Sequence, residues 1–314
     1  MYRDVLKSIE EAHHIIIHRH SHPDGDAIGS QIGLKHLIRA NYPEKPVYVV
    51  GDGAGRYAFM EDSTPDDIPD SLYDGALAII LDTSAKTLIS DNRYTKAPKT
   101  LRIDHHIFVE KIADIEVVDT TFESCAGLVA NIAISLGWTI SPLAAKSLYT
   151  GMITDSGRFR YDNTSSRTFA TASRLMEAGI QLSDIYSQLY ADDYEMIKLR
   201  ASYVLKMKFT PNKVAYIYTT AEEMAEMGAD TFTISRGMVN TMSDIRGVYV
   251  WVNFTEANGG VLCEIRSNRF NINQIAVKYG GGGHAKASGA TVPSRDVAMQ
   301  MLRDLDQLVG EQSK

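Results

Sequence analysis

Histidine and aspartate side chains that could bind a cation crowd the segment IIIHRHSHPDGDAIGS, residues 15–30. Its candidate ligands are His20, Asp24 and Asp26. Two carboxylates held ~4 Å apart repel each other by roughly 4 kcal/mol at an effective dielectric of 20, so a proton or a cation is expected between them. Pro-Asp and Asp-Gly are also ordinary turn dipeptides, and from this segment alone a solvated turn is an equally good interpretation.

Three other segments place the same side-chain types at the ends of apolar or helical patterns. They are Asp82 after the run 76–81, Asp104, His105 and His106 after the run 100–103, and Asp155 after the pattern 142–154. Because strands of a parallel sheet end at a common edge, their terminal side chains lie close together. The sequence therefore predicts that these carboxylates and imidazoles meet in one crevice.

Oxygen and imidazole donors without a thiolate suit Mn²⁺ or Mg²⁺ better than structural zinc. The set is larger than one ion needs and fits two ions ~3.5–4 Å apart that share a carboxylate and a water. Such a pair makes hydroxide available near neutral pH and holds the phosphoryl oxygens during in-line attack, which predicts phosphoester hydrolysis. The predicted metal ligands are His20, Asp24, Asp26, Asp82, His106 and Asp155.

Short apolar runs alternate with helical patterns in the first part of the chain. The three isoleucines at 15–17 are typical of a strand buried on both faces. Strands alternating with helices predict a mostly parallel sheet. The predicted strands are 15–17, 46–50, 76–81, 100–103 and 115–118, and the helices that follow them are 124–136, 142–154 and 165–178.

A second pattern follows a helical stretch at 181–207 and predicts a smaller domain with a mixed sheet. Its strands are expected at 214–218, 248–254 and 261–265, and its helices near 221–227, 234–242, 272–279 and 294–308. The whole chain is thus predicted to be α/β, with an N-terminal, mostly parallel sheet flanked by helices. The predicted boundaries are 1–185 for the catalytic domain, 186–207 for a helical linker and 208–314 for the second domain.

Composition limits the partners that the chain could have. The 314 residues are 44% hydrophobic and 23% charged, as in ordinary globular proteins. The net charge of -7 disfavours a surface for long duplex nucleic acid, which needs a basic stripe. No apolar run approaches the ~20 residues that span a bilayer, no signal-peptide core is present, and two cysteines are too few for a disulfide framework. We expect a cytoplasmic protein that does not bind membranes.

With these motifs in order, the sequence resembles the DHH superfamily of phosphoesterases. The resemblance rests on HSHPDGDAIGS (20–30), LDT (81–83), DHH (104–106) and the aspartate of GMITDSGRF (151–159). The second part is similar to the DHH-associated C-terminal domain through Arg266-Ser267 and GGGGHAKASG (280–289). The resemblance covers nearly the whole chain.

The resemblance implies a dinuclear site. In it, His20 and Asp24 would bind one ion, Asp26, His106 and Asp155 would bind the other, and Asp82 would bridge the two. His105 would face the scissile phosphate as a hydrogen-bond donor or general acid, and Asp104 would orient the histidines. Arg158 is a candidate clamp on the transferred phosphate, although an ordinary surface arginine is the alternative.

The second domain is expected to hold the far end of the substrate. A glycine run offers backbone N–H groups that can bind an anion, and a histidine follows it directly. A run of glycines can also be a flexible turn. The predicted substrate-binding residues are Arg266, Ser267, Gly280, Gly281, Gly282, Gly283 and His284.

Within the superfamily, the two-domain form looks most like the bifunctional oligoribonuclease and pAp phosphatases of the NrnA type. The resemblance implies hydrolysis of short RNA to mononucleotides and of 3′-phosphoadenosine 5′-phosphate (pAp) to AMP, by two-metal-activated hydroxide attack. A phosphodiesterase of linear or cyclic dinucleotides is the main alternative, and a non-catalytic nucleotide-binding regulator is a third. Two divalent ions are expected, Mn²⁺ first and Mg²⁺ or Co²⁺ as alternatives, and a homodimer is left open.

Overall fold

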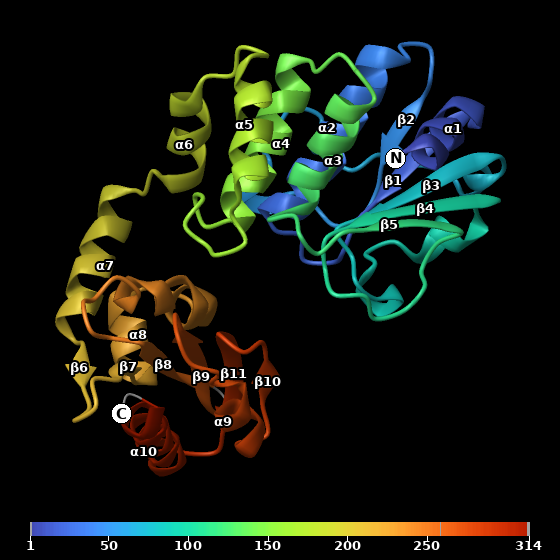
Figure 1. Ribbon diagram of the computed structural model, residues 1–314. Coiled ribbons are helices and arrows are strands. Elements are labelled where there is room, and N and C mark those ends of the chain that lie inside the picture. Colours follow the sequence, from blue (N-terminus) through green and yellow to red (C-terminus); the bar gives the residue numbers. More distant parts are fainter. Residues whose placement is uncertain (1, 258, 313–314) are drawn as a thin grey trace. The chain divides into compact units, whose positions relative to one another are not determined.

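The computed structural model describes residues 2–257 and 259–312. The chain forms two compact units, Met1–Ala191 and Asp192–Lys314 (Figure 1). The domain boundaries expected from the sequence, with a separate linker at 186–207, remain a prediction. Among the described residues, no helix combines the length and apolar character needed to cross a membrane.

Unit 1 contains a five-stranded sheet in the order β2-β1-β3-β4-β5, with every neighbouring pair parallel. Alternate residues of a strand point to opposite faces, and both faces of this sheet are covered. Ile15 and Ile17 face one hydrophobic core while Ile16 faces another. The strands are β1 (His14–His18), β2 (Val47–Val49), β3 (Ala76–Leu81), β4 (Lys99–Asp104) and β5 (Ile115–Val118).

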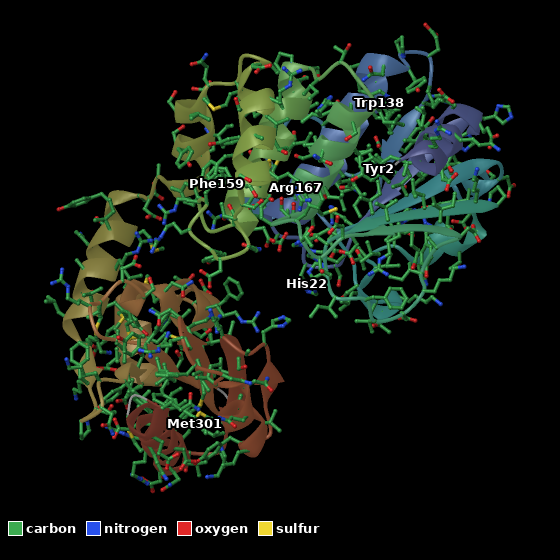
Figure 2. The ribbon with its side chains drawn as sticks, viewed as in Figure 1. Tyr2, His22, Trp138, Phe159, Arg167 and Met301 are labelled. Carbon is green, nitrogen blue, oxygen red and sulfur yellow. The ribbon has the colours of Figure 1, made fainter. Side chains whose placement is uncertain are left out.

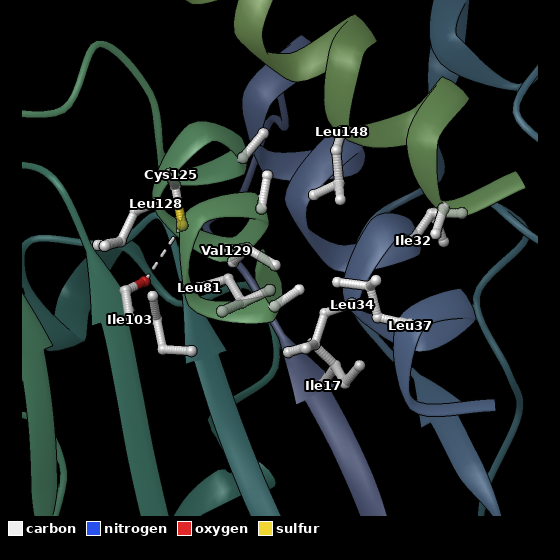
Figure 3. Close-up of a cluster of buried hydrophobic side chains, with 14 of the residues drawn as sticks. Ile17, Ile32, Leu34, Leu37, Leu81, Ile103, Cys125, Leu128, Val129 and Leu148 are labelled. Atoms are coloured by element: carbon white, nitrogen blue, oxygen red, sulfur yellow. Dashed lines mark hydrogen bonds between the residues drawn. The ribbon is translucent and has the colours of Figure 1, made fainter. Parts of the chain in front are cut away.

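Helices cover one face of this sheet, and short helical turns and loops cover the other. Figure 3 shows Leu81 and Ile103 of the strands beside Leu128 and Val129 of the helix that covers them. The thiol of the buried Cys125 donates to the carbonyl oxygen of Ile103 at 3.2 Å, which ties a helix to β4. The helices are α1 (Arg3–Glu11), α2 (Gly25–Asn41), α3 (Cys125–Ser135), α4 (Pro142–Asp155) and α5 (Ser166–Met176).

Two of these helices, α2 and α4, approach each other through glycines. A Cβ atom on Gly29 would lie 2.6 Å from the carbonyl oxygen of Ser147 and 2.7 Å from the nitrogen of Gly151. A Cβ atom on Gly151 would lie 2.9 Å from Oδ1 of Asp26. Glycine at both positions therefore lets the start of α2 lie against the end of α4, which carries Asp155.

The stretch 181–207, predicted as continuously helical, is two helices. They are α6 (Leu182–Tyr190) and α7 (Tyr194–Leu205). Ala191 and Asp193, between them, have extended backbone. Because aspartate disfavours helix interiors and favours the position before a helix, the two aspartates at 192–193 end one helix and begin the next.

Unit 2 contains a six-stranded mixed sheet in the order β10-β11-β9-β8-β7-β6. The segment 234–242, predicted as a helix, lies in a π-helical turn (Thr233–Gly237) followed by a 3₁₀ turn (Val239–Met242). The strands are β6 (Lys208–Phe209), β7 (Ala215–Thr219), β8 (Val250–Ala257), β9 (Gly260–Ser267), β10 (Gly282–Gly283) and β11 (Ala287–Val292), and the α-helices besides α7 are α8 (Ala221–Met227), α9 (Asn273–Lys278) and α10 (Arg295–Gln312).

Candidate metal centre

Two of the predicted metal ligands sit at the start of α2. Asp24 is the residue before the helix, and its Oδ1 accepts hydrogen bonds from the nitrogens of Asp26 and Ala27 at 3.0 Å each. Asp26 is buried and accepts hydrogen bonds from the nitrogens of Cys125, at 2.6 Å, and Ala126, at 2.8 Å. The first turn of α3 thus fixes the Asp26 carboxylate at the edge where the strands end.

Asp82 lies at the centre of the cluster, directly after β3. Its backbone has φ 51°, in the left-handed region that aspartate tolerates better than most residues. Oδ2 lies 3.5 Å from Nε2 of His20, and Oδ1 lies 3.5 Å from Nε2 of His105 and 3.6 Å from Nδ1 of His106. Oδ1 is buried and has no hydrogen-bond partner among the described residues. One carboxylate therefore faces imidazoles from two sides.

His105 also faces the remaining carboxylates. Its Nε2 lies 3.6 Å from Oδ2 of Asp26 and 3.5 Å from Oδ2 of Asp155, in addition to the contact with Asp82. The His105 side chain is 11% exposed. It therefore occupies the middle of a ring of three acidic groups.

Backbone carbonyl groups set the orientation of two imidazoles. Nδ1 of His20 lies 2.8 Å from the carbonyl oxygen of Ser21, and Nδ1 of His105 lies 3.3 Å from that of Phe122. A carbonyl oxygen only accepts hydrogen bonds, so each Nδ1 donates. In the neutral imidazoles the lone pair is then on Nε2, the atom that faces the carboxylates, which is the usual arrangement of a histidine that binds a metal.

Burial and mutual repulsion disturb the pKa values of the carboxylates. Burial, with the neighbouring Asp82 and Asp155, raises the pKa of Asp26 well above its ordinary value. Burial also raises the pKa of Asp155 to about 7, although the imidazole of His105 works in the opposite direction. For Asp82 the imidazoles of His105 and His20 outweigh burial and lower the pKa.

The pKa values of His20 and His105 are also raised. Burial alone would lower the pKa of His20, but Asp24 and Asp82 raise it to about 11. Burial likewise opposes a charge on His105, and its neighbours, Asp82 first, raise the pKa to about 10. The excess negative charge of the cluster thus draws protons onto the imidazoles.

A divalent cation fits this donor set. Oδ1 of Asp82 has no hydrogen-bond partner among the described residues, and carboxylate oxygens with imidazole nitrogens suit divalent ions. In each of three groups the ligand atoms lie within 4.8 Å of one another. The groups are His20, Asp24 and Asp82; Asp26, His105 and Asp155; and Asp82, His105 and His106.

The geometry differs from the predicted grouping at the two adjacent histidines. The prediction placed His106 with Asp26 and Asp155, whereas His105 is the residue whose Nε2 faces both carboxylates. The His106 side chain is 44% exposed, and its Nδ1 lies 2.8 Å from Oδ1 of Asp104. That carboxylate, as the strongest influence, raises the pKa of His106. His106 is thus a carboxylate-bound imidazole open to solvent.

Arg158 follows α4 in the left-handed region, with φ 63°, and is exposed. Its guanidinium carbon lies 4.7 Å from the ring centroid of Tyr190 on α6. The arginine therefore packs on an aromatic face of unit 1, and its role as a phosphate clamp stays a prediction.

In unit 2, much of the predicted anion-binding loop serves the fold. The nitrogens of Gly280 and Gly281 donate to the carbonyl oxygens of Val277 and Ala276, closing the end of α9. Gly282 and Gly283 form β10 and pair with β11. His284 is exposed and begins the connection between these two strands.

The other two predicted substrate residues lie at the end of β9. Arg266 donates through Nη1 to Oε2 of Glu264 at 3.1 Å and to the carbonyl oxygen of Ile265 at 3.0 Å. Ser267 is buried, and its Oγ donates to the carbonyl oxygen of Tyr249 at 2.9 Å. Both side chains are thus partnered within unit 2.

Comparison with known proteins identifies the family. Residues 14–152 match the N-terminal domain of the DHH family, and residues 214–311 match the DHHA1 domain. The chain is 32% identical to the bifunctional oligoribonuclease and PAP phosphatase NrnA of Bacillus subtilis, with 99% of both chains covered. The chain belongs to the DHH family.

Two further proteins are similar to the chain over nearly its whole length. A bifunctional oligoribonuclease and PAP phosphatase NrnA from Mycoplasma genitalium is 33% identical, covering 96% of this chain and 95% of the relative. The crystal structure of an exopolyphosphatase-related protein from Bacteroides fragilis is 27% identical and superimposes with a TM-score of 0.87, covering 98% and 96% of the two chains. The predicted α/β fold, with a parallel sheet followed by a mixed one, is confirmed.

One buried residue beside the DHH motif, Arg102, is not indicated as a site residue by the sequence pattern. Arg102 is fully buried, and its Nη2 lies 2.5 Å from Oδ2 of the equally buried Asp104. Oδ1 of Asp104 accepts hydrogen bonds from the nitrogens of His105, at 2.9 Å, and His106, at 3.3 Å. Arg102 alternates with apolar residues in β4, a pattern that suggests a solvent-facing side chain. The sequence pattern therefore does not indicate that Arg102 is buried and pairs with Asp104.

Proposed function

We propose that the protein is a metal-dependent phosphoesterase that hydrolyses short RNA oligonucleotides to mononucleotides and pAp to AMP. The observation that carries the proposal is the buried Asp82 carboxylate, whose two oxygens face His20 and His105 at 3.5 Å each. A carboxylate in this position can bridge two ions. The names of the relatives from Bacillus subtilis and Mycoplasma genitalium support the choice of substrates.

The proposed ligands divide into two sets around Asp82. His20 and Asp24 would hold one ion, and Asp26, His105 and Asp155 would hold the other, with Asp82 shared. We favour Mn²⁺ because the set mixes carboxylates with imidazoles and lacks thiolates. When bound, such a pair supplies Lewis acidity that lowers the pKa of water and neutralises charge on a phosphoryl group.

The chain's own residues supply orientation and proton transfer. The carbonyl groups of Ser21 and Phe122 hold His20 and His105 with Nε2 toward the carboxylates. Asp104 binds Nδ1 of His106. His106 in its charged form would therefore donate from Nε2 to a phosphoryl oxygen or to the oxygen that leaves.

The substrates are expected to be short. The chain carries an excess of acidic over basic residues, with a net charge of -7. Long nucleic acids are normally held by a basic surface that contacts many phosphates. A diribonucleotide or pAp presents few phosphates, which one metal centre and a few polar groups can hold. We propose the hairpin around His284 in the DHHA1 domain as a second anion contact, and Arg158 as a further contact to the transferred phosphate.

A substrate panel tests the proposal. Purified protein with Mn²⁺ is assayed on pAp, a diribonucleotide, a 24-nucleotide RNA, a cyclic dinucleotide and pyrophosphate. We expect turnover of the first two, and a loss of at least about 10³-fold in kcat/KM for Asp82→Asn, because one charge shared by both ions is removed. Asp184→Asn, an exposed carboxylate on α6, is the matched control. Equal activity of the Asp82 variant and the wild type would refute the proposal, and exclusive cleavage of the cyclic substrate would reassign it.

A further inference from the structure

Three consecutive apolar side chains are exposed immediately after the DHH motif. Ile107 is 80% exposed, Phe108 56% and Val109 64%. Single exposed apolar residues are common on protein surfaces. A contiguous group of them in a polar setting more often marks a binding surface. The residue before this group is His106, the open imidazole of the candidate site.

The exposed segment is held at both ends, so its exposure is built into the fold. At its start, Asp104 binds the backbone and the imidazole of His106. At its end, the carbonyl oxygen of Glu110 accepts a hydrogen bond from Nη1 of Arg102 at 3.1 Å. The Glu110 carboxylate also accepts a hydrogen bond from the nitrogen of Lys86 at 2.9 Å. The side chains of 107–109 are thus presented to solvent by an anchored loop.

Arg102 also contacts the aromatic ring of Phe108. Its guanidinium carbon lies 5.9 Å from the ring centroid of Phe108, within cation–π range. The same arginine binds Asp104, which in turn binds His106. The ring and the imidazole therefore share one buried support, and a bound molecule that contacts one lies close to the other.

We propose that Phe108, flanked by Ile107 and Val109, is a stacking platform for a nucleobase of the substrate. The inference rests on the proposed function and deepens it by assigning the base contact. Phe108 is two residues from His106, so their Cα atoms lie at most ~7 Å apart. A nucleotide whose phosphate lies at the metal centre carries its base close by, and unpaired bases stack on aromatic rings.

The platform predicts a preference among bases. Stacking on one aromatic side chain contributes about 1–3 kcal/mol, which corresponds to roughly 5- to 150-fold in affinity. The interaction grows with the area of overlap, so adenine gains more than uracil. It reads the ring and not its hydrogen-bonding edge, so the enzyme should accept every base while favouring purines.

The test compares substrates with and without a base. For the wild type and for Phe108→Ala, Phe108→Trp and Phe169→Ala, kcat/KM is measured on pAp and on ribose 3,5-bisphosphate. Phe169 is a matched control because it is 55% exposed and lies on α5, in the same unit. We expect Phe108→Ala to lower the ratio of kcat/KM on pAp to that on ribose bisphosphate about 5- to 150-fold, mainly through KM. Phe108→Trp should retain the ratio, and Phe169→Ala should leave it unchanged.

Each remaining outcome has a defined meaning. An unchanged ratio in Phe108→Ala, or an equal loss on both substrates, overturns the platform. A changed sedimentation coefficient with an unchanged ratio overturns it in favour of a contact between two copies of the chain. Equilibrium binding of AMP to the same variants measures the base contact without turnover. It therefore still tests the platform if the wild type hydrolyses no phosphoester, a result that would refute the proposed function instead.

Discussion

The candidate metal centre of unit 1 and the glycine-rich hairpin of unit 2 were both predicted from short motifs, but they use their polar groups differently. In unit 1, a buried oxygen of Asp82 makes no hydrogen bond within the described part of the chain, and His105 faces three carboxylates at 3.5–3.6 Å. In unit 2, the amides of Gly280 and Gly281 already donate to helix α9. Unsatisfied groups indicate a ligand, whereas satisfied ones indicate a structural element.

This difference depends on what surrounds each motif. Carboxylates of unit 1 are held by hydrogen bonds from regular elements, such as those from the first turn of α3 to Asp26. Their repulsion is therefore stored in the folded protein until a cation relieves it. The glycines of the hairpin contribute only backbone groups, which take part in the end of α9 and in the pairing of β10 with β11. Its contribution to binding, if the proposal for His284 holds, comes from one exposed side chain.

The largest expected effects separate the two adjacent histidines of the metal centre. His105→Ala removes the imidazole that faces Asp26 and Asp155, so calorimetric titration with Mn²⁺ should show the loss of one of two binding events. His106→Ala should retain both events and lose about 10²–10⁴-fold in kcat, the range of a general acid. His13→Ala, an exposed histidine before β1, is the control. Metal loss in the His106 variant instead would support the grouping first predicted from the sequence.

Adjacent residues explain why the sequence could place the site but not these roles. Apolar runs and helical periods predicted all five strands of the parallel sheet, and strand ends located the ligands. Neighbouring side chains in extended backbone point in opposite directions. Which histidine points toward the carboxylates depends on where the extended backbone of β4 ends. Sequence patterns do not locate the end of a strand to within one residue. It ends at Asp104.

The strands of unit 2 show a second limit. The short β10 and the strand β11 were not predicted, because ASGATV has small side chains and no apolar alternation. The glycine run by itself predicts free backbone amides, whereas in the structure β11 pairs with Gly282 and Gly283. Tertiary hydrogen bonds decide whether such amides are free, and no local pattern contains that information.

An intermediate effect comes from two neighbouring glycines in this hairpin. A Cβ atom on Gly281 would lie 2.0 Å from the carbonyl oxygen of Gly289, whereas one on Gly282 would have no atom of the described residues within 4 Å. Gly281→Ala should therefore lower the free energy of unfolding of unit 2 by about 1–3 kcal/mol, and Gly282→Ala should not. Urea unfolding is followed by fluorescence in a Trp138→Phe background, where Trp251 of unit 2 is the single tryptophan.

The same pair of variants tests whether the run binds anions. If the glycine amides hold a phosphate, Gly282→Ala should weaken pAp binding although the fold is intact. We expect its KM for pAp to be unchanged. A several-fold increase in KM without a change in stability would make the hairpin a binding site like that of unit 1 and remove the contrast between the two regions.

The smallest expected effect concerns Arg167, which lies at the start of α5 and is labelled in Figure 2. Its Nη2 donates to the carbonyl oxygen of Thr121 at 2.7 Å, and its guanidinium carbon lies 3.6 Å from the ring centroid of Phe122. The carbonyl oxygen of Phe122 binds Nδ1 of His105. Groups that orient a metal ligand typically change metal affinity 10- to 100-fold. Because Arg167 acts through one further residue, Arg167→Ala should weaken Mn²⁺ binding by about tenfold at most.

The measurement separates orientation from general stability. Mn²⁺ affinity and thermal stability of the metal-free protein are determined for Arg167→Ala, Arg167→Lys and Arg174→Ala. Arg174 lies on the same helix and pairs with the exposed Glu177, so its removal should change neither quantity much. Lysine keeps a charge over Phe122 but lacks the fork that reaches Thr121, so an intermediate Mn²⁺ affinity is expected. Lower stability with unchanged affinity would show that Arg167 supports the fold alone, and that the orientation of His105 depends only on the strand that precedes it.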